Sequence, residues 1–291
     1  MNKFSLFTFA ILVVLTTSCS EYNKVLKGDD YDAKWTMAGE LFEKGLTPKI
    51  DKEGIPLKKR NGELKSNANL LLRSVGLYEQ IYQRMAKTGE GEVAYYRIGS
   101  AYYHAKDYPM AGYYLGAFTQ RYPYSAKTEE AMFLSALCSV KSSPEYSLDQ
   151  NDTELAISNL QQFVDRYPDS PLIDSCNHIM DRMRLKLEKK DYESVKLYAK
   201  TENYRAAVTA AEAFNENYPL SSYKEEVALI HVNNCYSLAI NSIDTKKIER
   251  FEKTIESCNT FVTQFPQSKD LNHVKRMKEE AEKNLTRTDK I

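Results

Sequence analysis

Apolar residues recur along most of this chain with the three-and-four spacing of amphipathic helices, and one phrase marks where that pattern breaks. The phrase is an aromatic residue, three variable residues, a second aromatic residue, Pro, one further residue and Ser. It occurs at 118–125, 163–170, 214–221 and 261–268, with the prolines 45, 51 and 47 residues apart. Pro ends one helix because it lacks an amide donor, and Ser can cap the next helix. The pattern therefore predicts stacked helical hairpins.

Each phrase follows one predicted helix and precedes another. Helices are expected over residues 29–44, 68–87, 127–140, 152–167, 170–198, 204–217, 223–240, 246–265 and 270–285, with a further hairpin that turns at Asp107 and Tyr108. The expected fold class is all-α, a superhelical array of about five helical hairpins with a C-terminal capping helix, filling residues 29–291. The polar segment 45–67 holds two prolines and three glycines and is expected to be an extended insertion.

The hairpin at residues 95–123 is the clearest unit. Its apolar, small and terminating positions are Tyr95, Ile98, Gly99, Tyr102, Ala111, Leu115, Phe118 and Pro123. Their spacing resembles the tetratricopeptide signature at all eight positions, with Tyr95 in the place of its Trp. We expect Gly99 to let the two helices approach closely and Phe118 to pack on the next hairpin.

Composition and charge argue against several kinds of function. The 40 basic and 40 acidic residues cancel, which gives no sign of a nucleic-acid partner. The four histidines lie in four different predicted helices, with no metal-ligand spacing, nucleophile motif or phosphate loop beside them. We therefore expect no catalytic residues, no metal, no cofactor and no enzymatic activity.

The N-terminal segment has the layout of a bacterial lipoprotein signal. Lys3 precedes an apolar run from Phe4 to Leu15, which is too short to span a membrane, and small residues lead from there to Cys19. This arrangement resembles a lipobox, although Thr16 stands where Leu is usual. An ordinary cleaved signal that happens to contain a cysteine is the alternative.

A lipobox implies a lipid anchor. We expect residues 1–18 to be removed as a signal peptide, Cys19 to be lipidated, and residues 19–28 to form a tether. Ser20 differs from the Asp commonly linked to retention at the inner membrane. The expected location is therefore the outer membrane, with the body of the protein in the periplasm.

Four further cysteines raise the question of disulfides, because the periplasm is oxidising. They are Cys138, Cys176, Cys235 and Cys258. Cys235 and Cys258 flank a predicted turn near Asp244 at unequal distances, which leaves them about 8 Å apart along the helix axes at 1.5 Å per residue. Free thiols in helix interfaces are the favoured interpretation, and a disulfide among the four stays open.

The lipobox, the hairpins and one helix of some thirty residues together resemble the BamD family, lipoproteins of the outer-membrane β-barrel assembly machinery. The likeness is most specific at residues 101–111, at 185–208 and in the loop 143–150, and the longer insertion at 45–67 departs from it. The resemblance implies a non-enzymatic scaffold. Its partners would be a BamA-like barrel protein, at the C-terminal repeats, and the C-terminal signals of precursor outer-membrane proteins, at the N-terminal repeats.

Tetratricopeptide arrays line their concave groove with fixed positions of each first helix. Counted from Trp35 and Tyr95, these positions are Thr36, Glu40, Glu43, Tyr96, Ser100, Tyr103 and His104. Such a groove suits an extended segment that ends in an aromatic residue. The alternative is that Tyr96 and Tyr103 are packing residues. For the barrel protein, Tyr192 and Lys196 at the corresponding places of the fourth hairpin are the candidate contacts.

Two other functions compete with this hypothesis. A periplasmic adaptor of the Tol-Pal type shares the Tyr-Pro-x-Ser repeats, but such proteins usually lack a lipobox and begin with a coiled coil. A superhelical cell-wall hydrolase would need a catalytic carboxylate in a suitable context, and muramidase activity would reveal it.

The lipid anchor provides the first test. Cells that express the chain with radiolabelled palmitate should label the wild-type protein, and Cys19→Ala should abolish the label because the thiol that carries the lipid is gone. Label that persists in Cys19→Ala would contradict the predicted lipidation site.

Overall fold

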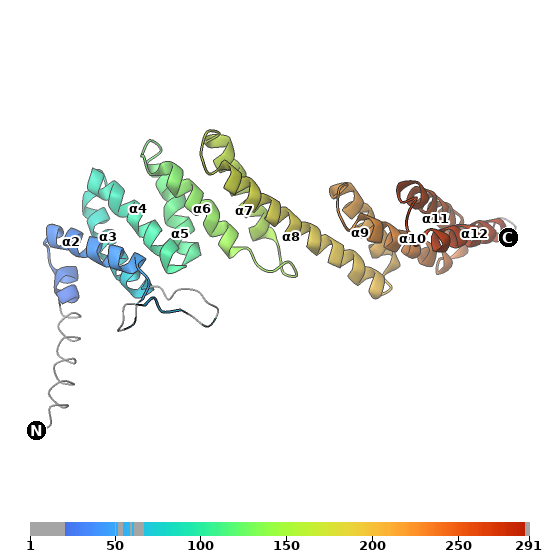
Figure 1. Cartoon of the computed structure of the whole chain (residues 1–291), viewed down its shortest axis with the longest axis horizontal. Coiled ribbons are helices and arrows are strands. Elements are labelled where there is room, and N and C mark those ends of the chain that lie inside the picture. Colours follow the sequence, from blue (N-terminus) through green and yellow to red (C-terminus); the bar gives the residue numbers. More distant parts are fainter. Residues whose placement is uncertain (1–20, 50, 52–54, 59, 61–66, 289–291) are drawn as a thin grey trace, which may run out of the picture. The chain divides into compact units, whose positions relative to one another are not determined.

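A computed structural model describes residues 21–49, 51, 55–58, 60 and 67–288. The predicted signal peptide and Cys19 lie outside these residues. The chain forms two compact units, which we call unit 1 (up to Pro144, with 150–180) and unit 2 (145–149, and from Asp181 onward). The elements labelled α2 to α12 in Figure 1 are all helices. This confirms the expected all-α fold with successive helical hairpins.

Unit 1 begins with a helical stretch at residues 21–27. Its further helices are α2 (Tyr31–Leu46), α3 (Ala68–Met85), α4 (Gly89–Ala105), α5 (Tyr108–Arg121), α6 (Thr128–Ser142), α7 (Asn151–Arg166) and the first part of α8 (Ile173–Lys200). From α2 to α7, each helix packs on the next one along the chain. Asp30 and Asp107 cap α2 and α5 through their side chains, and Thr88 caps α4 in the same way.

Unit 2 continues the same arrangement. It contains the second part of α8, followed by α9 (Tyr204–Asn217), α10 (Lys224–Ile240), α11 (Asp244–Gln264) and α12 (Leu271–Thr288). Its cores lie between successive helices, for example where Tyr192 and Val195 of α8 meet Phe214 of α9 and Val227 of α10. The predicted long helix and the predicted capping helix are both present.

The four repeated phrases form one and the same turn, which we call the phrase turn. The amide of the second aromatic residue donates to the carbonyl of the first at 2.9 Å, and the serine amide donates to the carbonyl of the second aromatic residue at 3.1 Å, in all four cases. The serine hydroxyl accepts from the amide two residues further on at 3.0 to 3.2 Å. The next helix then begins three residues after the serine. Ser therefore starts the turn that leads into α6, α8, α10 and α12.

The phrase turn also joins helices that are distant in the chain. The hydroxyls of Ser125, Ser170 and Ser221 donate to the carboxylates of Glu92, Glu129 and Glu188 at 2.5 to 2.6 Å. The first aromatic residue of every phrase is at most 1% exposed, and its ring lies 5.0 to 5.4 Å from the second aromatic ring. Each turn thus combines a buried phenylalanine, in contact with a half-buried aromatic ring, with polar contacts at its surface.

The long helix α8 contains the first helix of a hairpin. Glu188 makes within α8 the contact that Glu92 makes in the first turn of α4, and the two residues are 96 positions apart. The same offset relates Lys106 to Glu202, which end α4 and α8 with positive φ angles of 67° and 57°. The second part of α8 therefore repeats α4, which accounts for the 51-residue spacing between two of the prolines.

Two segments differ from the expectation. Residues 21–27, expected as part of a tether, are helical, and Tyr22, Val25 and Leu26 pack on the core of α2 and α3. Within the expected insertion 45–67, α2 extends to Leu46, and the amide of Leu57 donates to the carbonyl of Lys49 at 2.7 Å.

The four described cysteines are buried and free, as the interpretation of interface thiols predicts.

Two glycines of α4 provide a test of the packing. A Cβ on Gly91 would lie 1.9 Å from the carbonyl oxygen of Met85, a backbone atom that cannot move away cheaply, whereas a Cβ on Gly89 would meet nothing within 4 Å. We expect Gly91→Ala to lower the free energy of unfolding by about 1–3 kcal/mol or more, because it overpacks the α3–α4 junction.

Gly89→Ala is the matched control, since it places the same residue in the same helical turn. It should leave stability unchanged or raise it by up to about 1 kcal/mol. Urea unfolding followed by circular dichroism measures both variants, and equal stabilities would contradict the close approach at Gly91.

Candidate functional site

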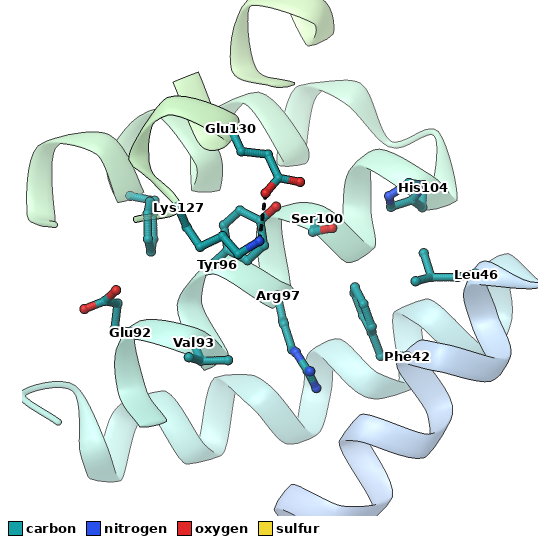
Figure 2. A pocket seen from close by; sticks show the side chains of 11 residues that line it. Phe42, Leu46, Glu92, Val93, Tyr96, Arg97, Ser100, His104, Lys127 and Glu130 are labelled. Atoms are coloured by element: carbon teal, nitrogen blue, oxygen red, sulfur yellow. Dashed lines mark hydrogen bonds and ion pairs between the residues drawn. The ribbon is translucent and has the colours of Figure 1, made fainter. Parts of the chain in front are cut away.

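A cavity of about 340 Å³ lies between α2, α4 and α6 in unit 1, and Figure 2 shows its walls. Its lining residues are Phe42, Leu46, Glu92, Val93, Tyr96, Arg97, Ser100, His104, Phe118, Lys127 and Glu130. Leu46 and Val93 are 41% and 40% exposed, so the cavity has an apolar rim that is open to solvent. Apolar walls with a few fixed polar groups are typical of ligand sites.

A polar cluster occupies one wall. Lys127 donates to the Glu130 carboxylate at 2.9 Å, and its ammonium lies 5.4 Å from the centre of the Tyr96 ring (Figure 2). Burial and a hydrogen bond to Glu130 raise the pKa of Tyr96 well above its ordinary value. Although burial alone would raise it, the hydrogen bonds from Lys127 and Tyr96 lower the pKa of the Glu130 carboxyl. Tyr96 therefore stays neutral while Glu130 stays charged.

The opposite wall is mainly apolar and comes from α2. Phe42 and Leu46 face the cavity, and the guanidinium of Arg97 lies 5.3 Å from the Phe42 ring. A hydrogen bond of 2.6 Å from Arg97 to the Tyr78 hydroxyl holds this guanidinium in place. The site thus offers an aromatic and aliphatic surface beside paired charges of both signs, which suits a segment of polypeptide with apolar side chains.

The structure brings three of the predicted groove residues together and places the others elsewhere. Tyr96, Ser100 and His104 line the cavity. Tyr103 is half-buried, with its ring 5.4 Å from the His104 ring and 6.0 Å from the Tyr108 ring. On α2, the residues Thr36, Glu40 and Glu43 are exposed and do not line the cavity, and Glu40 forms an exposed ion pair with Lys44 at 2.9 Å.

The lining residues that the tetratricopeptide positions do not supply come from four helices. Phe42 and Leu46 lie on one face of α2, four residues apart, and Lys127 and Glu130 belong to the start of α6. The others are Glu92, Val93 and Arg97 of α4 and Phe118 of α5. An apolar step from Phe42 to Leu46 was visible in the sequence. The approach of α6 to α4 was not, because it depends on how the hairpins stack.

Unit 2 holds a counterpart of this cavity, displaced by 96 residues in sequence. The Tyr192 hydroxyl donates to Glu226 at 2.7 Å, as Tyr96 bonds to Glu130. Tyr223 stands at the place of Lys127, and its ring stacks on Tyr192 with 4.0 Å between the centroids. Tyr192 is 5% exposed and Tyr96 is 8% exposed, so both tyrosines lie inside a helix interface.

The counterpart cavity has about 420 Å³ and a different charge pattern. Its lining residues are Glu193, Lys196, Leu197, Ala199, Lys200, Glu226 and Ile230. Four of these positions correspond to Arg97, Ser100, His104 and Glu130 of unit 1. Of the predicted pair in the fourth hairpin, Lys196 lines this cavity. Its ammonium group lies 4.8 Å from the centre of the Tyr192 ring.

One cluster in unit 2 resembles a nucleophile beside a base, but its geometry differs from that of a catalytic relay. The Nε2 atom of His231 lies 3.5 Å from Cys235 Sγ and 3.4 Å from Glu212 Oε1, so both neighbours share one ring nitrogen. A Cys-His-acid relay uses both ring nitrogens. Burial also raises the pKa of the Cys235 thiol to about 11. Cys235 is therefore a protonated packing residue.

The comparison with known families adds one finding. The model of a family described as outer membrane lipoprotein, YfiO, matches residues 78–251, more than half of the chain. The chain belongs to the YfiO family. The matched range runs from within α3 to within α11, and so includes the α4 and α6 walls of the unit 1 cavity and the whole unit 2 cavity.

A relative carries the name that the family resemblance suggested. The outer membrane protein assembly factor BamD of Caulobacter vibrioides is 24% identical over 143 residues, which cover 49% of this chain and 47% of the relative. The aligned part thus spans about half of that protein. The BamD-family resemblance is confirmed. None of the helices in the described ranges of this YfiO-family chain is both long and apolar enough to cross a membrane.

The His231 cluster predicts how stability depends on pH. The His231 side chain is 15% exposed, and burial lowers its pKa below the ordinary value of 6.5, although Glu212 opposes the shift. In the unfolded chain this histidine takes up a proton near pH 6.5, while the folded chain does so only at lower pH. The unfolded state therefore binds more protons, and the free energy of unfolding should fall as pH drops below about 6.5.

His231→Gln should reduce this fall, measured by urea unfolding between pH 8 and 5. His178→Gln, which changes an exposed histidine of α8, is the control and should leave the slope as in the wild type. Identical slopes in wild type and His231→Gln would contradict the role given to the buried imidazole.

Proposed function

We propose that this protein is a lipid-anchored, non-enzymatic scaffold of the outer-membrane β-barrel assembly machinery. The observation that carries the proposal is the family match over residues 78–251, together with a relative named as an outer membrane protein assembly factor. The stacked hairpins support it, because repeat arrays act through extended binding surfaces. The buried thiols and the His231 geometry also favour a protein that binds over one that catalyses.

The unit 1 cavity is the proposed receptor for the C-terminal signals of precursor outer-membrane proteins. Strands of such barrels alternate apolar and polar side chains. An extended segment of this kind would place an aromatic side chain against Phe42, Leu46 and Val93, while its polar groups reach Lys127 and Glu130. Tyr96, which is neutral, contacts both members of this charged pair through its hydroxyl and its ring. Ser100 and His104 also line the cavity.

The unit 2 cavity is the proposed contact for a BamA-like barrel protein. It lies among the C-terminal repeats, and Leu197 is 58% exposed beside Lys196 and Lys200. An apolar side chain flanked by two ammonium groups suits a partner surface with apolar and acidic residues. The lipid on Cys19 would hold both cavities in the periplasm at the outer membrane.

Binding of a synthetic peptide tests the first cavity. The probe is a fluorescent ten-residue peptide with alternating apolar residues and a C-terminal Phe, titrated into the purified protein. Val93→Arg should weaken binding about tenfold or more, because it places a charge in the apolar rim. Leu155→Arg is the matched control, since Leu155 is 52% exposed on α7 and outside the cavity, and it should bind as the wild type does.

Purification of the full-length protein from membranes in mild detergent tests the second cavity. A BamA-like barrel protein should co-purify, and Lys200→Glu should reduce its recovery while Lys275→Glu, an exposed charge reversal on α12, should not. Recovery of no barrel protein with the wild type would overturn the proposed membership of the assembly machinery.

A further inference from the structure

Residues 21–27 are firmly attached to α3. The Tyr22 hydroxyl donates to the carbonyl of Arg73 at 3.0 Å, and the Arg73 guanidinium lies 4.2 Å from the centre of the Tyr22 ring. Gly76 leaves room for this contact, because a Cβ there would come within 3.3 Å of the Tyr22 hydroxyl oxygen. Val25 and Leu26 pack beside them on the apolar core of the first hairpin.

Lys34 secures the other end of the same stretch. Its side chain is only 2% exposed, and its ammonium donates to the carbonyl of Leu26 at 2.9 Å and to the side-chain oxygen of Gln80. A buried ammonium group is strongly destabilising without its acceptors, so release of residues 21–27 would cost the structure more than the apolar contacts alone. We call residues 21–27 with Lys34 and Arg73 the N-terminal clasp.

We infer that the N-terminal clasp holds unit 1 directly against the phospholipid surface that carries the anchor. This inference rests on the lipidation of Cys19 in the proposed function. Only Ser20 separates Cys19 from the clasp, and two residue steps span at most about 7 Å. Exposed Lys24 and Lys27 come within reach of anionic headgroups, and Glu21 is the exposed acidic residue among them.

The consequence is a fixed height above the membrane. Because residues 21–27 pack on α3 and accept a hydrogen bond from Lys34 of α2, the first hairpin cannot move away from the bilayer as a body on a loose linker would. Phe42 and Leu46 of that hairpin form one wall of the unit 1 cavity. The cavity therefore stays close to the phospholipid surface.

The single tryptophan, Trp35, makes this height measurable, since it directly follows Lys34. The lipidated full-length protein is placed in vesicles of phosphatidylethanolamine and phosphatidylglycerol that contain some dansyl-labelled phosphatidylethanolamine, and energy transfer from Trp35 to dansyl is recorded. A flexible Gly/Ser linker of about 12 residues between Ser20 and Glu21, with a mean reach of about 17–21 Å, should lower the transfer at least twofold. The same linker added after Ile291 is the control and should leave the transfer unchanged.

A second variant opens the clasp without lengthening the chain. Lys34→Met combined with Tyr22→Ala should also lower the transfer, while circular dichroism confirms that the helices persist. Transfer that is unaffected by the inserted linker in a lipidated protein would overturn the inference alone. Mass analysis of the mature N-terminus identifies the other failure, because an unmodified Cys19 would overturn the proposed anchor and this inference with it.

Discussion

A hydrogen bond from the serine of a phrase turn to a glutamate of an earlier helix links neighbouring hairpins at three of the four phrase turns. It is a short bond to a charged acceptor, worth about 1.5–3 kcal/mol, and the same serine also starts the turn into the next helix. One side chain therefore sets both where a helix begins and how far the neighbouring hairpin lies from it. The fully buried Phe ahead of each turn adds the apolar contact that makes this spacing stable.

The same constraint shapes the candidate binding site. Glu92 accepts the bond from Ser125 and also lines the unit 1 cavity, as does Phe118 of that phrase. The cavity is therefore a product of the repeat spacing. In unit 2 the spacing recurs, but Tyr223 replaces Lys127 and stacks on Tyr192, so the same framework presents a cavity with different residues and different charges. The repetition of one hairpin geometry with altered side chains gives two cavities with different lining residues.

The sequence could predict those parts of the site that depend on contacts within one helix. Tyr96, Ser100 and His104 share one face of α4 by helical periodicity, and the sequence was sufficient to group them. The same rule placed Thr36, Glu40 and Glu43 in the groove, whereas the structure leaves them exposed outside the cavity and puts Phe42 and Leu46 of α2 on the cavity wall instead. Residues 21–27 were expected to be a tether for a similar reason: their docking depends on Arg73, Gly76 and Lys34, which are distant in the chain.

The sequence by itself determined the helices from α2 onward, their order and the positions of the turns, because Pro, Ser and the three-and-four apolar spacing act through neighbours a few residues away. It also determined that the long helix contains a hairpin start, since the 51-residue interval requires it. Only the tertiary structure decided which side chains enclose the cavities, that Tyr192 is buried while Lys196 reaches the surface, and that the N-terminal clasp closes on the first hairpin. Those outcomes depend on interhelical angles and on contacts between residues some 30 to 50 positions apart, which no local pattern encodes.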